Sequence, residues 1–198
     1  MNDKLVIASG NKGKIAEIKS ILGPFFKEII SQVEAGLDIE VDETGSTFQE
    51  NALLKAREAA KLLGTAVIAD DSGLCVDCLG GAPGVLSARY AGPQHDDEDN
   101  RQRLIKECAA FKAPRTARFV SAVALVFPGG EELLATGSVE GEILLEPKGD
   151  GGFGYDCLFY YPPFGKTFAE ISFDEKNEIS HRRMALMKLK VYFEGKAE

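Results

Sequence analysis

The sequence predicts an α/β fold: a mixed central sheet flanked by helices, in two lobes around a substrate cleft. Three features of the chain lead to this prediction. In the first half, short apolar segments alternate with helical patterns, as in sheets that helices cover. In the middle, longer apolar segments joined by glycine-rich turns indicate antiparallel strands. No repeat or low-complexity linker interrupts the 198 residues, so we expect residues 1–198 to form a single two-lobed domain.

The first half is predicted to run strand, helix, strand, helix. Residues 5–8 form a short apolar strand, and the helix after it carries apolar residues at spacings of three and four until Gly23. A second strand is expected at residues 29–30. The clearest helix starts with a capping box, in which Thr47 is the cap and Glu50 follows three residues later.

The second half is predicted to combine long strands with two helices. Pro128 to Gly130 is typical of a hairpin turn between strands. The expected elements, in order, are a helix over 96–111, strands at 116–127, 133–135, 138–145 and 157–161, and a helix over 180–193 that packs Met184, Met187 and Val191 inward.

Composition narrows the class of protein. The net charge is −8 and the pI about 5.0, which argues against a general nucleic-acid binder because such proteins carry basic faces. The start of the chain lacks the apolar core of a signal peptide, and no segment reaches the ~20 apolar residues of a membrane span. The four cysteines include one CxxC without a second pair at zinc-site spacing, so we expect reduced thiols in a cytoplasmic protein.

Two adjacent carboxylates, Asp70 and Asp71, give the strongest indication of chemistry. The apolar residues 66–69 before them predict a buried strand, and Ser72-Gly73 after them predicts a turn. Ligands collect at strand ends in sheets covered by helices, and ionised carboxylates brought together there need a compensating charge. Mg²⁺ prefers carboxylate oxygens and is therefore the expected cation. This segment alone favours equally an Asx turn with both carboxylates in water.

A turn that could bind phosphate is the second candidate. Ser9 to Lys14 joins a strand to a helix start, where backbone N–H groups point outward unpaired and carry partial positive charge. Lys12 and Lys14 add full charges, and Gly10 and Gly13 allow a phosphate to come close to the backbone. The pattern is neither a Walker motif nor Gly-x-Gly-x-x-Gly, and taken alone it fits an ordinary turn with solvated lysines better.

Two segments late in the chain could hold the rest of a nucleotide. Residues 149–154 match Gly-x-Gly-x-x-Gly, but a strand is expected after them, so we interpret them as a tight loop presenting Phe153 and Tyr155 and not as a dinucleotide fingerprint. An aromatic side chain there could stack on a base; otherwise these aromatics belong to the core. His181 and Arg182 lie at a helix start, which indicates either a polar or anionic ligand or a solvated basic turn.

Seven short motifs occur in order along nearly the whole chain. Together they resemble the inosine-triphosphate pyrophosphatase family, and most of all its bacterial XTP/dITP diphosphatase branch. Each motif is weak alone, but seven in this order are hard to obtain by chance. They are residues 9–14 (SGNKGK), 43–52 (ETGSTFQENA), 68–74 (IADDSGL), 79–84 (LGGAPG), 87–90 (SARY), 152–156 (GFGYD) and 179–182 (ISHR).

This resemblance implies a homodimer with a long mixed sheet, and a role for most of the singled-out residues. Asp71 would be the general base and a metal ligand, and the acidic pair Asp42 and Glu43 would supply another Mg²⁺ ligand. The family usually has Glu-Glu-Thr-Gly where this chain has Asp42-Glu43-Thr44-Gly45, so either acid of the pair could bind the metal. The substrate-binding residues that the resemblance implies are Ser9, Gly10, Asn11, Lys12, Gly13, Lys14, Lys55, Ser72, Phe153, Gly154, Tyr155, Asp156, Lys176, His181 and Arg182.

The reaction implied by the resemblance is Mg²⁺-dependent hydrolysis of ITP, dITP and XTP to the monophosphate and pyrophosphate. Asp71 would accept a proton from the water that attacks the α-phosphorus. Donors from the backbone or from the His181-Arg182 turn would select the 6-oxo group of the purine. Three other readings stay open: a phosphatase that releases orthophosphate stepwise, a non-catalytic module that binds a dinucleotide at residues 149–154, and a protein-interaction domain. We expect a purine nucleoside triphosphate as ligand, and neither nucleic acid nor membrane as partner.

Overall fold

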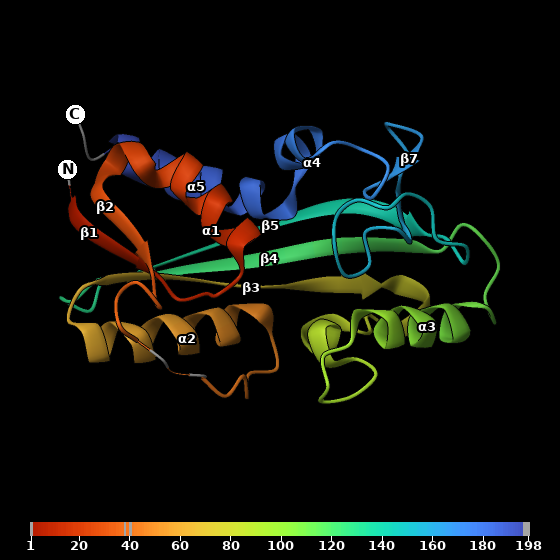
Figure 1. The fold of residues 1–198 in the computed structure, drawn as a ribbon, viewed down its shortest axis with the longest axis horizontal. Helices are drawn as coiled ribbons and strands as arrows, with labels where there is room; N and C mark the ends of the chain where they lie inside the picture. Colours follow the sequence, from red (N-terminus) through yellow and green to blue (C-terminus); the bar gives the residue numbers. More distant parts are fainter. Residues whose placement is uncertain (1, 38, 40, 196–198) are drawn as a thin grey trace. The chain divides into compact units, whose positions relative to one another are not determined.

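The computed structural model describes residues 2–37, 39 and 41–195, and its strands form one mixed sheet of seven strands in the order β2-β1-β3-β4-β5-β6-β7 (Figure 1). The predicted α/β class is confirmed. The elements are β1 (Asn2–Ile7), α1 (Lys12–Leu22), η1 (Gly23–Phe25), β2 (Phe26–Ser31), α2 (Phe48–Leu63), β3 (Ala66–Val76), η2 (Asp77–Leu79), η3 (Gly84–Arg89), α3 (Asp97–Cys108), β4 (Thr116–Val126), β5 (Glu132–Ile143), β6 (Phe159–Tyr161), β7 (Lys166–Thr167), α4 (Phe173–Ile179) and α5 (His181–Gly195).

The chain divides into two compact units, and the boundaries between them fall within strands β3, β4 and β5. Unit 1 consists of Met1–Asp71, Ser121–Gly137 and His181–Glu198, and unit 2 of Ser72–Val120 and Ser138–Ser180. Each unit has an apolar core of its own. Within the described ranges, every helix is too short or too polar to cross a bilayer.

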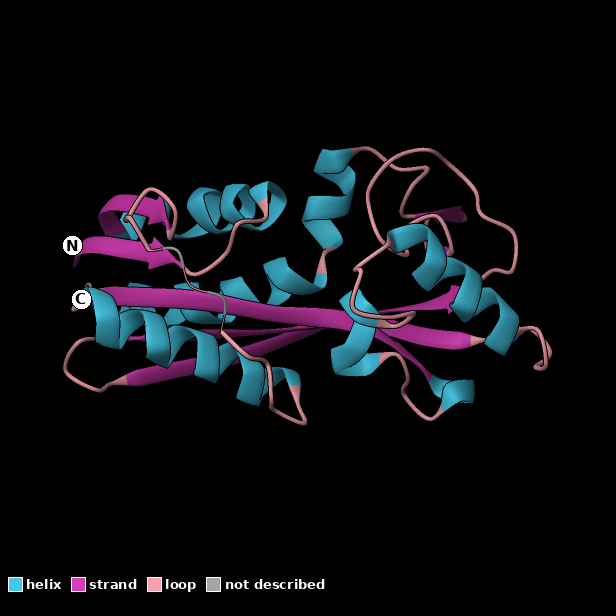
Figure 2. Cartoon of the chain, turned by 60° about the horizontal axis from the view of Figure 1, so that its bottom comes forward, coloured by secondary structure: helices cyan, strands magenta, loops and turns pink. Residues whose placement is uncertain are grey.

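Unit 1 holds the parallel part of the sheet. Strand β1 pairs in parallel with β2 on one side and with β3 on the other, where Ile7 lies opposite Ile68. Helices α1 and α5 contact each other and pack on one face of these strands, burying Ile18 and Leu186 in the same cluster (Figure 1). Helix α2 covers the other face and lies along it in Figure 2. Its predicted capping box is present at Thr47.

Strand β3 continues beyond the expected turn at Ser72-Gly73, so the prediction of a turn is wrong. Leu74 is buried, and its N–H donates to the Ser87 hydroxyl over 2.9 Å. A Cβ on Gly73 would clash with that hydroxyl and lie 2.6 Å from the carbonyl oxygen of Gly84. Glycine at this position therefore serves close packing against η3 rather than chain reversal.

The last strands and helices differ from the predictions in their limits. One strand, β5, replaces the two predicted at 133–135 and 138–145, and Gly137 lies within it, where the absence of a Cβ lets the backbone of α5 approach closely. Helix α5 buries Leu186 and Leu189, whereas Met184 and Val191, which were predicted to face inward, are exposed.

Unit 2 contains two elements that the sequence reading missed, helix α4 and strand β7. Helix α4 has a capping box of its own, formed by Ser172 and Glu175. Strand β6 pairs antiparallel with β5, and Phe159 of β6 packs against Phe119 and Phe168 in the core of this unit.

Candidate functional site

The first of the two adjacent carboxylates, Asp70, lies in a buried ion-pair cluster of unit 1. Its carboxylate pairs with Lys14 Nζ at 2.6 Å and with Arg182 Nε at 3.4 Å, and it accepts a hydrogen bond from the Ser121 hydroxyl. Glu17 pairs with Nη1 of Arg182. Two cations and two carboxylates thus balance each other, and three of the four side chains are at most 7% exposed. We call these four side chains and Ser121 the Asp70 cluster.

The cluster keeps Asp70 ionised. Burial by itself would raise the pKa of Asp70, but the nearby guanidinium of Arg182 and ammonium of Lys14 together hold it well below its usual range. Burial lowers the pKa of Lys14, and the attraction of Asp70 opposes this effect. Asp70 is therefore a fixed anion that orders the two cations around it.

The second carboxylate, Asp71, faces a different set of partners. Lys55, on α2, places its Nζ 3.5 Å from Asp71 Oδ1 and 2.6 Å from Glu43 Oε1. The same ammonium donates to the backbone carbonyl of Asp70 over 3.0 Å. Consecutive side chains of a strand point to opposite faces, which explains why the two aspartates have separate partners. On this side the two carboxylates of Glu43 and Asp71 share the ammonium of Lys55.

The surroundings of Asp71 suit a base. Burial is the largest influence and raises the pKa of Asp71; Lys55 lowers it, and the charge of Glu43 raises it further. A raised pKa brings a carboxylate closer to the range in which general bases work best. Burial would lower the pKa of Lys55, but Asp71 and Glu43 together raise it, so Lys55 stays cationic.

The donor set on this side fits magnesium in its chemistry. Glu43 and Asp71 both reach a single cationic group, while the side chain of Asp42 is exposed. The structure therefore brings Glu43, and not Asp42, to Asp71. No group of three or more His, Cys, Asp or Glu side chains that could hold a metal ion occurs in the described part of the chain. Such a group is not required, because Mg²⁺ is commonly held by one or two carboxylates together with substrate phosphates and water.

Asn51 is a residue of this site that the sequence reading did not single out. It is fully buried on α2, and its side-chain oxygen accepts the N–H of Gly45 over 2.8 Å. A Cβ on Gly45 would lie 2.6 Å from that oxygen. Asn51 therefore ties down the segment that carries Glu43. In the sequence, Asn51 could have been found through its place in the motif at residues 43–52.

The predicted phosphate-binding turn exists, but the N–H groups that we expected to be unpaired are partly used. Asn11 caps α1, and its side-chain oxygen accepts from Gly13 N at 2.9 Å and from Lys14 N at 3.1 Å. Ser9 Oγ accepts from Asn11 N in turn. Lys12 is exposed at the start of the helix. A phosphate bound at this turn would contact a helix start that Asn11 already caps. The exposed side chain of Lys12 would supply the positive charge there.

The second group of predicted residues lies in unit 2, around the glycine-rich loop. Phe153 is 55% exposed, and Lys176 Nζ lies 4.6 Å from the centroid of its ring. Asp156 is buried and accepts from Lys176 Nζ at 2.5 Å and from the N–H of Phe153 at 2.9 Å. Tyr155 is buried, and its hydroxyl donates to the carbonyl of Ser87 over 2.8 Å. Of the two aromatics, Phe153 is therefore displayed and Tyr155 belongs to the core.

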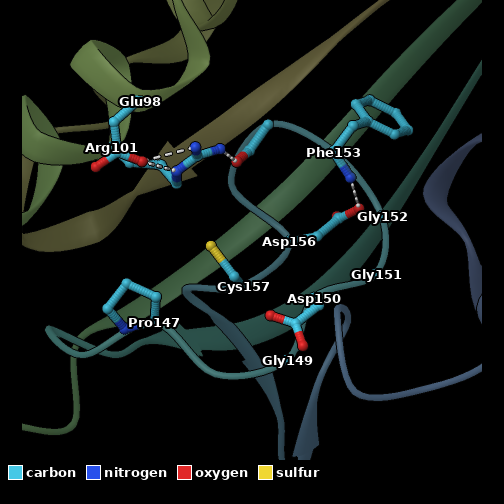
Figure 3. Close-up of a pocket in the computed structure, with 11 residues that line it drawn as sticks. Glu98, Arg101, Pro147, Gly149, Asp150, Gly151, Gly152, Phe153, Asp156 and Cys157 are labelled. Carbon is cyan, nitrogen blue, oxygen red and sulfur yellow. Dashed lines mark hydrogen bonds and ion pairs between the residues drawn. The ribbon is translucent and has the colours of Figure 1, made fainter.

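This loop also lines a cavity of about 310 Å³, shown in Figure 3. Arg101 and Cys157 lie on the wall of the cavity, and the ring of Phe153 points away from them. The next element after the loop is strand β6, as expected, and not the helix that a dinucleotide fingerprint opens.

The predicted residues thus fall into two groups, one in each unit. In unit 1 the structure groups Lys14, Lys55, Glu43, Asp71 and Arg182 around the carbonyl and carboxylate of Asp70, with Ser9–Gly13 ahead of α1 and a buried His181 at the start of α5. In unit 2 it groups Phe153, Asp156 and Lys176. Ser72 follows Asp71 in β3 and is half-buried.

Comparison with known proteins gives consistent matches over almost the whole chain. The model of the Ham1 family matches residues 5–192. A dITP/XTP pyrophosphatase of Bacillus subtilis is 50% identical over 191 residues, which cover 96% of each chain. One from an Exiguobacterium species is 51% identical over 186 residues, 94% of each chain. The structure of the Staphylococcus aureus Ham1 protein superposes with a TM-score of 0.90 at 45% identity, covering 98% of this chain and 99% of that one.

Proposed function

The chain belongs to the Ham1 family, and from that premise we propose that it hydrolyses the non-standard purine nucleoside triphosphates ITP, dITP and XTP to the monophosphate and pyrophosphate, with Mg²⁺. Relatives named dITP/XTP pyrophosphatase share about half of its residues over nearly their full length. The observation that carries the proposal is the arrangement of Asp71, Lys55 and Glu43, where a buried base lies beside a cation and a second carboxylate.

In this reaction Asp71 takes the proton of the attacking water. Its raised pKa improves it as an acceptor, and Lys55, 3.5 Å away, keeps it in place and stabilises the ionised form before the proton arrives. Glu43 and Asp71 are the residues that would hold Mg²⁺. When bound, Mg²⁺ would neutralise part of the charge of the triphosphate and of the two carboxylates that share Lys55. The proton acceptor and the metal ligands thus lie within one small group of side chains.

Lysine side chains would balance the negative charge of the substrate's phosphates. Lys55 is fixed by its two carboxylates and by the carbonyl of Asp70, and Lys12 extends from the start of α1. Positioning and charge stabilisation account for most of the acceleration in phosphoryl transfer, so fixed cations are the main requirement.

The base would be recognised by stacking and by polar contacts to its 6-oxo group. Phe153 offers an exposed ring, and Lys176 beside it carries an ammonium donor that Asp156 orients. A donor suits an oxygen at position 6 and not the amino group of adenine, which leaves a polar group unpaired. Homodimer formation and a cytoplasmic location belong to the same proposal.

The direct test is a panel of triphosphates assayed for pyrophosphate release. Purified protein with Mg²⁺ is incubated with ITP, dITP, XTP, ATP and GTP, and pyrophosphate and orthophosphate are measured separately. We expect pyrophosphate from the first three at far higher kcat/KM than from ATP, whose 6-amino group cannot accept the donor; GTP also has a 6-oxo group, so its kcat/KM measures selection at the 2-position of the purine. Stepwise orthophosphate would instead identify a general phosphatase, and tight nucleotide binding without turnover would identify a binding module. Sedimentation at micromolar concentration tests the dimer.

A further inference from the structure

Helix α3 holds the glycine-rich loop at one residue, Gly154. The N–H of Gly154 donates to Asp97 Oδ2 over 3.0 Å, and its carbonyl accepts from Arg101 Nη1 over 2.8 Å. Asp97 and Arg101 are four residues apart on α3 and so lie on the same face of the helix. Both backbone polar groups of a single loop residue are therefore bound by side chains from one helix, and Figure 3 shows Arg101 reaching toward the loop.

Arg101 is itself fixed before it reaches the loop. Its Nε and Nη2 both donate to Glu98 Oε2, at 3.1 and 2.7 Å, and its side chain is only 21% exposed. The planar guanidinium can serve Glu98 and the Gly154 carbonyl at the same time, which a lysine could do only in part. Arg101 thus holds the loop in a fixed position relative to α3.

The residue next to this anchor is Phe153. Its own N–H is bound by Asp156, and Gly151, two residues before it, donates to the carbonyl of Ala169 over 3.1 Å. The ring is more than half exposed, so its position depends on how firmly the backbone on each side is held. Asp156 and Ala169 hold the side before the ring, and α3 holds the side after it.

We propose that Arg101 and Asp97 are positioning residues for base recognition: by fixing Gly154 they order Phe153 before the purine arrives. This inference rests on the proposed function, because it takes Phe153 as the stacking partner of the base. Ordering an aromatic side chain on binding costs affinity, so a ring that is already ordered binds the base more tightly. Neither residue touches the reacting phosphate, so their effect falls on binding and not on chemistry.

Arg101→Met tests the proposal, because methionine keeps much of the apolar stem and removes the donors. We expect KM for dITP to rise about three- to tenfold while kcat changes by less than about twofold, since only binding is weakened. Asp97→Asn, which loses the charged acceptor, should raise KM less. Arg101→Lys should recover part of the loss, because an ammonium can still donate to the Gly154 carbonyl. Arg57→Met is the matched control. Arg57 donates two hydrogen bonds to the carboxylate of Glu132, as Arg101 does to that of Glu98, and neither Arg57 nor Glu132 belongs to α3 or to the proposed site.

A double-mutant cycle shows whether Arg101 acts through Phe153. In a Phe153→Ala background, Arg101→Met should change KM by less than about twofold, because the ring that it positions is already gone. The chain contains no tryptophan, so Phe153→Trp introduces a single fluorescent reporter at this position. Adding Arg101→Met to that variant should lower the fluorescence anisotropy of the indole, and adding Arg57→Met should not.

The outcomes separate the inference from the function that it rests on. Equal KM values for Arg101→Met and Arg57→Met would overturn the inference, as would a full rise in KM in the Phe153→Ala background. A fall in kcat with KM unchanged would also overturn it, because that pattern shows less folded enzyme or the loss of an interaction made only in the transition state, and neither is a loss of base binding. If the wild-type protein released no pyrophosphate from dITP, the proposed function would fail, while the anisotropy measurement would still report whether α3 orders the loop.

Discussion

Replacing Asp70 by asparagine removes one of the two carboxylates that balance Lys14 and Arg182 inside unit 1. The side chain of Asp70 is 1% exposed, and its carboxylate lies 2.6 Å from the Lys14 ammonium. In the variant, the buried Arg182 keeps its ion pair with Glu17, but Lys14 and Arg182 both lose the carboxylate that they share. The asparagine oxygen can still accept from Ser121, which limits the loss to the ionic part.

The expected effect is large for a substitution that changes so few atoms. Breaking a buried ion pair by removing one partner costs about 3–5 kcal/mol, because the remaining charge is buried and unpaired. For a chain of this length each kcal/mol lowers Tm by roughly 2–4 °C, so a decrease of about 6–20 °C is expected. High salt should not restore the lost stability, because buried pairs are only weakly screened.

The measurement is urea and thermal unfolding followed by circular dichroism, with Lys14→Met as the partner substitution. Lys14→Met/Asp70→Asn removes one charge of each sign, so its loss should be smaller than the sum of the two single losses. If Asp70→Asn unfolded within about 1 kcal/mol of the wild type, the view that the Asp70 cluster is a balanced buried unit would be refuted. Strict additivity in the double variant would refute the coupling of Lys14 with Asp70.

Four further predictions follow from the same side chains. Asp71→Asn should abolish pyrophosphate release and leave the circular dichroism spectrum unchanged; normal turnover of ITP would remove Asp71 from the role of base. EDTA should stop the reaction and added Mg²⁺ should restore it, and full activity in EDTA would exclude a metal requirement. Because the folded-state pKa of Asp70 is lowered, its stabilising contribution is complete above the unfolded pKa of about 3.9 and is lost as pH falls below it, so the urea midpoint should fall less steeply with acid in Asp70→Asn than in the wild type. Gly73→Ala should destabilise by about 1–3 kcal/mol because its Cβ meets Ser87 and Gly84, and an unchanged urea midpoint would contradict that packing.

Local signals in the sequence predicted the elements that have strong local causes. The capping box at Thr47 marks the start of α2 as expected, and the left-handed Gly64 ends the helix. The strand, turn and helix from β1 into α1 were also expected. Two short elements were missed: β7 has only two residues, and α4 has only seven, although the capping box of Ser172 and Glu175 was a local signal for its start.

The site could be predicted only as far as its motifs extend. Lys55 was expected to bind substrate only because of the family resemblance, and only the fold shows that it contacts Glu43 and Asp71. Glu17 and Arg182 are 165 positions apart, so no local pattern could pair them. The same holds for Arg101 and Gly154, which come together because α3 packs beside the loop.

The two aspartates of β3 make strand register a condition for activity. A slip of β3 by one residue against β1 would turn each carboxylate to the opposite face of the sheet, so that Asp70 would lose Lys14 and Asp71 would lose Lys55. Such a chain could keep most of its secondary structure and still be inactive. The quality of a purified sample should therefore be judged by turnover per molecule. The helix content does not report which carboxylate lies on each face of β3.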